Sequence, residues 1–170
     1  PIPMKVYART IAFLEIGDKE AARLKTMPSL IYMPPDLSYE PYVLPPVRYP
    51  DGKIYLKIGG DPVDIQLETV LEMKDWFRGP GNSDVASFLA DKLMGLMPGL
   101  ECRSVTYASC ATSFTPSGGP LIHAQSDQCV VLTAGNGAGA KCADELGRLG
   151  ALVATEQDLS GEGYECDFKT

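Results

Sequence analysis

The sequence has no run of about 20 apolar residues, which is the length that a membrane-spanning helix needs. Its first residues also lack the charged, apolar and small-residue regions of a secretory signal peptide. The 15 basic residues are outnumbered by 22 acidic ones, the net charge is -7, and basic residues form no cluster. These absences argue against a membrane span and against a protein that binds the phosphate backbone of nucleic acids.

Cysteine and histidine are scarce in the patterns that bind metals. Five cysteines, at positions 102, 110, 129, 142 and 166, include no C-x-x-C pair, and His123 is the single histidine. This count argues against a disulfide framework and against a zinc site. We expect most of the thiols to be small buried residues. Free thiols are typical of a reducing compartment, so we also expect a cytoplasmic protein without a metal.

The residues that are present suit a globular protein of 170 residues, with 45% hydrophobic and 22% charged side chains. Proline crowding predicts a loop over residues 34–50, and polar composition predicts a loose tail over 160–170. Alternation together with β-branched and aromatic residues predicts a strand over residues 4–15. Short apolar or β-branched runs predict further strands over residues 27–33, 53–58, 101–115, 121–124 and 129–134, the last nearly all apolar and therefore buried. Helical spacing predicts helices over residues 18–26, 66–78, 84–97 and 138–154, with Asp18 and Ser83 as caps of the first and third.

Glycines concentrate between the last expected strand and the last expected helix, in Gly135-Asn136-Gly137-Ala138-Gly139. A helix N-terminus offers unpaired N–H groups and partial positive charge, and glycines let a ligand approach closely. Such a turn can stabilise an anion or an electron-rich carbonyl. The turn lacks the Lys-Ser/Thr of a P-loop and the downstream strand of a dinucleotide site. A tight packing turn between strand and helix is the equal alternative.

Three side chains are candidates for chemistry. Lys57 lies in an alternating strand pattern that places it on the same side as Tyr55 and Gly59. Lys141 lies in the first turn of the last expected helix, where a cation opposes the helix dipole and so hints at a ligand charge. Cys110 lies in mid-strand and is either a packed thiol or a nucleophilic or cofactor-linked cysteine. Solvated surface lysines are the alternative for Lys57 and Lys141.

Three stretches share their order with one known family. They are Tyr55–Gly60 (YLKIGG), Cys110–Pro116 (CATSFTP) with the following Gly119–Ile122 (GPLI), and Ala134–Lys141 (AGNGAGAK). In these stretches the chain resembles the C-terminal half of FAD-dependent amine and amino-acid oxidoreductases of the D-amino-acid oxidase type, in particular the sarcosine oxidase branch. The resemblance implies an α+β fold, in which flanking helices cover a mixed, largely antiparallel sheet.

The resemblance also implies an organisation into lobes. Residues 1–115 would form a substrate-domain lobe, residues 116–160 the last segment of the FAD lobe, and residues 161–170 a tail. Family members carry an upstream Rossmann GxGxxG that holds the ADP half of FAD, and the chain does not contain this motif. A strand-like start at Pro1, where a natural terminus is usually loose, fits a piece of a longer protein.

We therefore expect a fragment of an enzyme that uses FAD to oxidise the C–N bond of an amine or amino acid, inactive by itself. The missing Rossmann half or a partner subunit would complete it. The alternative is a non-catalytic subunit or interaction module that completes a site on a partner chain. A small independent anion-binding domain that uses Gly135–Gly139 is a third possibility.

The family implies a role for each matching residue. Gly135, Asn136, Gly137, Ala138 and Gly139 would face the flavin ring and stabilise negative charge on its N1–C2=O edge. Lys141 matches a lysine that pairs with the substrate carboxylate. Lys57 matches a lysine near flavin N5 that promotes the reaction with oxygen. Cys110 matches the cysteine that links covalently to the flavin in monomeric sarcosine oxidases.

Three departures separate the sequence from the sarcosine oxidase branch. Thr112 stands where that branch has a tyrosine beside the cysteine, and Asp61 stands where it has a substrate-side histidine. The glycine turn is one residue shorter. These departures argue against sarcosine itself as the substrate and make Asp61 the substrate-side candidate at its position.

Overall fold

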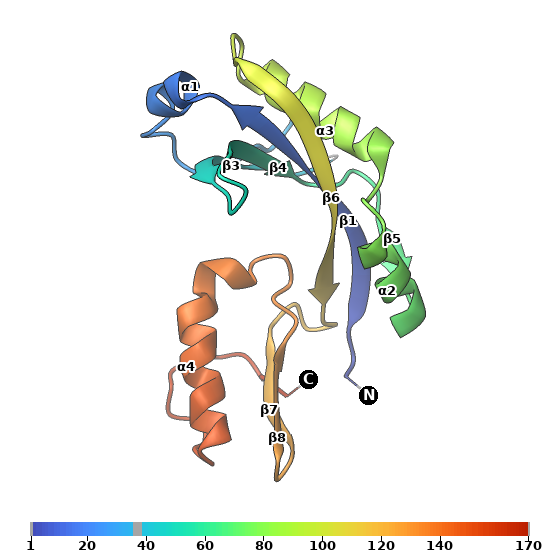
Figure 1. Cartoon of the computed structure of the whole chain (residues 1–170). Helices are drawn as coiled ribbons and strands as arrows, with labels where there is room; N and C mark the ends of the chain where they lie inside the picture. Colours follow the sequence, from blue (N-terminus) through green and yellow to red (C-terminus); the bar gives the residue numbers. More distant parts are fainter. Residues whose placement is uncertain (1, 36–38, 170) are drawn as a thin grey trace. The chain divides into compact units, whose positions relative to one another are not determined.

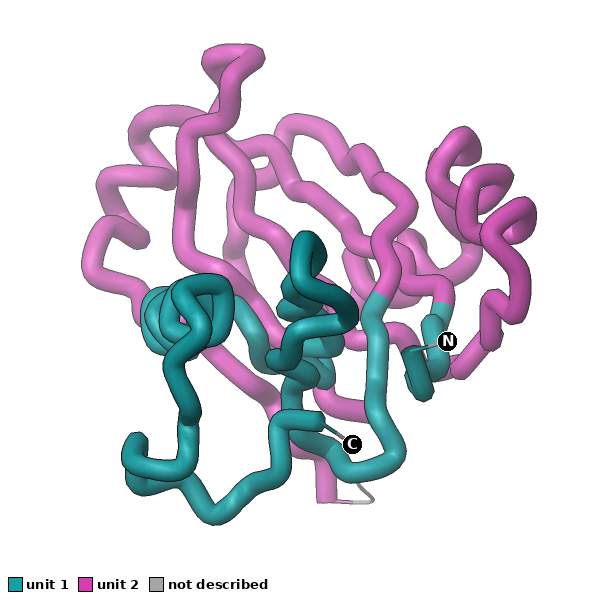
Figure 2. The backbone as a smooth tube through the Cα atoms, turned by 90° about the horizontal axis from the view of Figure 1, so that it is seen from below, with its two compact units in different colours: residues 1–7, 112–170 teal, residues 8–111 magenta. Residues whose placement is uncertain are grey.

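The computed structural model describes residues 2–35 and 39–169. Figure 2 shows that the chain forms two compact units. The sheet unit comprises residues 8–111, and the hairpin unit comprises residues 1–7 together with 112–170. Two long strands, β1 (Lys5–Ile16) and β6 (Cys102–Phe114), run along the chain from one unit into the other.

The sheet unit is built on a six-stranded sheet (Figure 1). Its strand order is β2 (Leu30–Ile31), β3 (Tyr42–Arg48), β4 (Ile54–Gly59), β1 and β5 (Ile65–Leu67), and β6 also pairs with β1. The β2–β3, β3–β4 and β4–β1 pairs are all antiparallel. This architecture confirms the expected α+β class with a largely antiparallel sheet.

The strict alternation of β1 decides which face of the sheet becomes the core. Its even-numbered residues from Val6 to Ile16 are buried, while its odd-numbered residues from Tyr7 to Glu15 are half-buried. The buried face packs against helices α1 (Asp18–Arg23) and α3 (Ser83–Leu96), with the contacts from α3 made by Leu89, Ala90 and Leu93. Burying side chains of this size contributes roughly 1.5–3 kcal/mol each. The helices therefore cover one face of the sheet, and the half-buried residues occupy the other.

The helices begin at residues that satisfy their first N–H groups. Asn82 caps α3, because its side chain accepts from the amides of Asp84 and Val85. A capping box of Thr69 and Glu72 begins α2 (Val70–Arg78). The expected caps at Ser83 and Asp18 are therefore wrong by one position, since Ser83 is the first residue of α3 and Gly17 precedes α1.

The hairpin unit contains strands β7 (Leu121–Ser126) and β8 (Cys129–Thr133), a 3-10 turn over Gly139–Cys142, and helix α4 (Ala143–Ala154). Its small core joins Ile122, Leu149 and Phe168. The amide of Ile122 donates to the carbonyl of Phe168 at 2.8 Å. The expectation of a loose tail from residue 160 is therefore wrong, because the buried Phe168 attaches this segment to the core of the hairpin unit.

Two further expectations are corrected. Residues 34–50 contain the strand β3 rather than only a loop. Pro45 and Pro46 lie where the β3–β4 register shifts, a place where an extended strand tolerates a missing N–H. The thiols of Cys129, Cys142 and Cys166 are exposed rather than buried. These three cysteines lie on a hairpin, a 3-10 turn and the tail, which have little core to bury them.

Candidate functional site

Lys57 lies on the sheet face that the helices leave uncovered within the sheet unit. In the register of the sheet it is opposite Phe13 of β1 and Leu44 of β3. Its half-buried side chain places Nζ 5.5 Å from the centre of the Tyr42 ring. We call this surface, with Phe13, Tyr42, Tyr55, Lys57 and Gly59, the Lys57 face. The expected alternation of Tyr55, Lys57 and Gly59 agrees with this arrangement.

The pair Gly59-Gly60 is required by close packing against β3. A β-carbon added at Gly59 would lie 2.6 Å from Cε1 and Oη of Tyr42, because the ring lies directly on this glycine. At Gly60 the backbone φ is +113°, and an added β-carbon would lie 2.4 Å from Cα of Pro41. Gly60 therefore excludes a side chain, and a side chain at Gly59 would displace the Tyr42 ring. The glycines of the YLKIGG stretch therefore leave room for Tyr42 beside Lys57.

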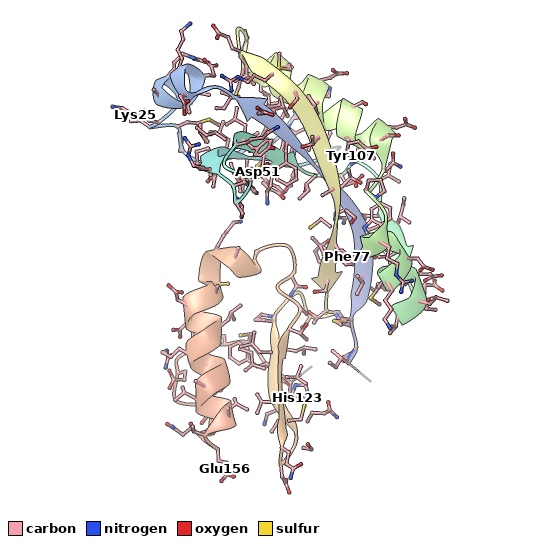
Figure 3. The ribbon with its side chains drawn as sticks, viewed as in Figure 1. Lys25, Asp51, Phe77, Tyr107, His123 and Glu156 are labelled. Carbon is pink, nitrogen blue, oxygen red and sulfur yellow. The ribbon has the colours of Figure 1, made fainter. Side chains whose placement is uncertain are left out.

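Cys110 of β6 contributes to the same environment. Burial, and then the neighbouring charge of the Cys110 thiol, raise the pKa of Tyr42. The thiol of Cys110 itself is half-buried. The carbonyl of Cys110 accepts a hydrogen bond of 2.7 Å from Nε1 of Trp76 on α2, which fixes the backbone of β6 at this residue. Phe77, next to Trp76, is 57% exposed on the same helix (Figure 3).

Asp61 lies just beyond the end of β4 and is tied to β1. Its Oδ2 accepts a hydrogen bond from the amide of Thr10 at 3.0 Å. Nearby, Oδ1 of Asp64 lies 2.7 Å from a terminal nitrogen of Arg9, whose side chain is only 16% exposed. Arg9 belongs to the odd-numbered set of β1, as Phe13 does. The end of the Lys57 face therefore carries a guanidinium held by a carboxylate.

In the hairpin unit the turn of residues 134–139 is strongly bent. Ala134, Asn136 and Gly137 have φ values of 60°, 48° and 74°, in the left-handed region that costs free energy for most residues other than glycine. A β-carbon at Gly135 would lie 2.9 Å from Cα of Gly139. The turn therefore closes on itself so tightly that Gly135 cannot carry a side chain.

Asn136 fastens the turn to the end of β6. Its amide donates to the carbonyl of Ser113 at 3.1 Å, and its Oδ1 accepts from the amide of Thr115 at 2.9 Å. Its Nδ2 donates to the carbonyl of Ala134 at 2.7 Å. Within residues 2–35 and 39–169, the amides of Gly135 and Gly137 have no hydrogen-bond acceptor. These two N–H groups can therefore bind an electron-rich ligand atom.

Lys141 lies in the 3-10 turn of Gly139–Cys142, and α4 begins only at Ala143. The expectation that the helix starts at about residue 138, with Lys141 in its first turn, is wrong by this one turn. The side chain of Lys141 is exposed. First-turn positions of α4 are instead occupied by Asp144 and Glu145, whose charges match the helix dipole.

The candidate residues thus form two groups. The sheet unit contains Lys57 beside Tyr42, the half-buried Cys110 on β6, and Asp61 just beyond the end of β4. The hairpin unit brings together the turn Gly135–Gly139 and Lys141. Below this turn, an apolar cavity of about 280 Å³ is lined by Leu132, Ala134, Gly135, Gly139, Ala143 and Leu146, among others.

Tyr42 and Trp76 are site neighbours that the sequence reasoning missed. Tyr42 lies in the stretch whose prolines predict a loop, and Trp76 contacts β6 across 34 residues of sequence. The signal for Tyr42 was the Gly59-Gly60 pair, since paired glycines on a strand indicate a close neighbour.

Among the residues that the structure describes, no group of three His, Cys, Asp or Glu could hold a metal ion. None of the helices in the described ranges is long and apolar enough to cross a membrane.

The fold is shared with solved oxidase structures. Amadoriase I, a fructosyl amine:oxygen oxidoreductase from Aspergillus fumigatus, matches 96% of this chain with a TM-score of 0.63 and 15% sequence identity. A thermally stable mutant of fructosyl peptide oxidase matches 94% with a TM-score of 0.61 and 16% identity. Amadoriase II from Aspergillus fumigatus, a fructosamine oxidase solved in complex with FSA, matches 92% with a TM-score of 0.59 and 16% identity.

This chain spans 37%, 39% and 36% of the length of these three proteins, in the same order. No protein-family model and no curated protein sequence matches it. The chain therefore has the fold of part of these oxidases.

Proposed function

We propose that this chain supplies the substrate lobe and the last flavin-contacting segment of an FAD-dependent oxidoreductase that oxidises the C–N bond of an amine or amino acid. The observation that carries the proposal is the fold shared over 96% of the chain with an oxidase of fructosyl amines. Residues 1–115 are assigned to the substrate lobe and residues 116–160 to the flavin segment. An ADP-binding half, in the same polypeptide or in a partner chain, completes the cofactor site.

The residues of both groups fit a flavin. The turn at Gly135–Gly139 offers two amides without acceptors and no side chain at Gly135, which suits an electron-rich carbonyl edge. The Lys57 face offers a cation beside an aromatic ring and a half-buried thiol at Cys110. When bound, FAD supplies the acceptor for the two electrons of the C–N bond. Cys110 is the residue to examine for a covalent bond to the cofactor.

The chain's own residues bind and orient. Lys57 holds positive charge on the flavin side of the sheet, where it favours the reaction of oxygen as electron acceptor. Lys141, exposed beside the glycine turn, pairs with a substrate carboxylate. Asp61 uses one oxygen for the amide of Thr10 and has the other for a substrate ammonium group. Free thiols, three of them exposed, suit a reducing compartment, and we propose a cytoplasmic location.

The test is a titration with FAD of the chain alone and of the chain assembled with an ADP-binding half. We expect the chain alone to be colourless and the assembly to be yellow with one flavin bound. Gly135→Ala should weaken binding, because its β-carbon meets Gly139, whereas Gly119→Ala is the matched control, since its β-carbon would meet only Oγ of Ser117 at an ordinary 3.9 Å. Stoichiometric FAD on the chain alone would overturn the need for a second half. A colourless assembly would overturn the flavin assignment itself.

A further inference from the structure

Two lysines, one just before β4 and one within it, have different kinds of partner. Lys53, immediately before β4, forms an ion pair of 2.8 Å with Glu15. Lys57, within β4, lies over the ring of Tyr42 with 5.5 Å between Nζ and the ring centre. A carboxylate neutralises the positive charge that it binds. An aromatic face attracts the cation through its quadrupole and leaves the net charge in place. A carboxylate therefore neutralises the charge of Lys53, whereas Lys57 keeps its net positive charge.

Tyr42 is held for this contact by three structural constraints. It is paired with Gly59 in the β3–β4 register, so its ring and Lys57 share one face. The missing side chain at Gly59 leaves room for the ring, whose Cε1 lies 2.6 Å from where a β-carbon would stand. Pro41 packs equally closely on Gly60, which fixes the backbone just before Tyr42. The position of the ring is therefore built into the backbone of β3 and β4.

We propose that Tyr42 is a positioning residue that holds the ammonium group of Lys57 on the Lys57 face without neutralising it. The importance of the Tyr42–Lys57 contact for catalysis rests on the proposed function, because a cation that assists the reaction with oxygen must keep its charge. The contact itself does not depend on that function. Burial and the Cys110 thiol raise the pKa of Tyr42, so the hydroxyl also stays uncharged and cannot act as a counter-ion.

Competitive acetylation of the chain, followed by mass spectrometry of the lysine peptides, tests the contact. Lys53 is the internal reference, since its partner Glu15 is untouched by changes at Tyr42. Tyr42→Leu should acetylate Lys57 about 2- to 30-fold faster relative to Lys53, the range that loss of a cation–π contact predicts. Tyr42→Phe keeps the ring and should keep the wild-type ratio. Tyr164→Leu is the control for loss of a ring elsewhere, because Tyr164 packs on Phe168 in the hairpin unit.

Nuclear magnetic resonance of the unaltered chain gives a second test that needs no variant. A ring above Lys57 should shift the signals of its ε-methylene protons upfield of those of Lys53. Tyr42→Phe should retain that shift. Equal signals for the two lysines, or an unchanged acetylation ratio in Tyr42→Leu, would overturn the proposal. Equal behaviour of Tyr42→Phe and Tyr42→Leu would also overturn it, by assigning the effect to the hydroxyl. Because neither measurement involves FAD, these outcomes are separate from failure of the proposed function.

Discussion

The carboxylate of Asp61 accepts a hydrogen bond of 3.0 Å from the backbone amide of Thr10. Thr10 is fully buried, and its hydroxyl accepts in turn from the amide of Asn82 at 3.0 Å. The pairing of β1 with β4 covers Ala12–Ile16, so Thr10 lies beyond the end of that ladder. Asp61 therefore replaces a missing strand partner, and the same side chain joins β1 to the residues that follow β4.

Replacing Asp61 by alanine should destabilise the sheet unit by about 1–3 kcal/mol, because a buried amide loses its acceptor. Asp61→Asn keeps an acceptor oxygen and should cost less. Asp64→Ala, which removes the more exposed partner of an ion pair with Arg9, should cost less than about 1 kcal/mol. Unfolding in urea measures all three. An Asp61→Ala variant as stable as the wild type would show that this carboxylate has no structural task.

Gly59→Ala should destabilise the protein by about 1–3 kcal/mol, the usual cost of forcing a group into a filled space. The added β-carbon would meet the Tyr42 ring, which has to move, and the contact with Lys57 should be lost with it. Gly95→Ala is the control, because open space surrounds that glycine on α3 and alanine suits a helix better. The midpoints of urea unfolding of the two variants and the wild type measure these differences in stability. Equal midpoints for Gly59→Ala and the wild type would mean that Tyr42 does not rest on Gly59.

Asn136 both forms side-chain hydrogen bonds and adopts a left-handed backbone conformation, and two variants separate these contributions. They are Asn136→Ala and Asn136→Gly. Both remove the side-chain bonds to Thr115 and Ala134, whereas only glycine relieves the left-handed φ of 48°. We expect alanine to destabilise the hairpin unit by about 1–3 kcal/mol and glycine to cost less. Amide hydrogen exchange at Thr115 should accelerate in both variants. Unchanged exchange at Thr115 would contradict the role of Asn136 as a fastener.

The hairpin unit contains a cluster that responds to acid. Arg148 donates two hydrogen bonds to Glu145, at 2.8 and 2.6 Å, and the hydroxyl of Tyr164 donates a third at 2.7 Å. These bonds, chiefly that of Arg148, lower the pKa of Glu145 from 4.5 to about 2. Because the pKa of Glu145 is lower in the folded state, its ionised carboxylate stabilises the fold at pH values above 4.5. That contribution is lost as the pH falls from 4.5 towards 2.

Below pH 4.5 the tail that contains Tyr164 should therefore loosen progressively from α4. Hydrogen exchange of residues 159–168, measured as the pH is lowered, reports the release. Glu145→Gln should loosen the tail already at neutral pH and remove most of the pH dependence. Glu165→Gln, which removes a carboxylate from the same segment, should behave as the wild type. A tail equally protected at pH 2 and at neutral pH would contradict the prediction.

Much of the architecture follows from local patterns. The alternation of β1 gave its buried face, and the helical spacing of residues 84–97 placed α3 to within one residue at each end. The strand β3 was missed because its prolines predict a break, whereas a register shift beside β4 accommodates them. The packed tail was missed because its polar composition hides a single buried anchor, Phe168.

The candidate site was harder to predict, because its contacts join distant parts of the chain. Lys57 and Gly59 could be identified from a short motif in one strand, but their neighbour Tyr42 belongs to another strand. The glycine turn was identified by composition, yet its attachment to Ser113 and Thr115 through Asn136 is a tertiary contact. The roles of Cys110, Lys141 and Asp61 in binding remain predictions, since sequence pattern defines residue types and not the ligand that they meet.

The central claim is that this chain contributes to the oxidation of amines by FAD. Its most direct test is the flavin absorbance of the chain assembled with an ADP-binding half, followed after anaerobic addition of amines, N-alkyl amino acids and fructosyl amino acids. We predict that at least one of these substrates bleaches the flavin band, that air restores it, and that Lys57→Met slows this recovery while Lys53→Met does not. A flavin band that every amine leaves unchanged and that a nicotinamide cofactor bleaches would contradict the account.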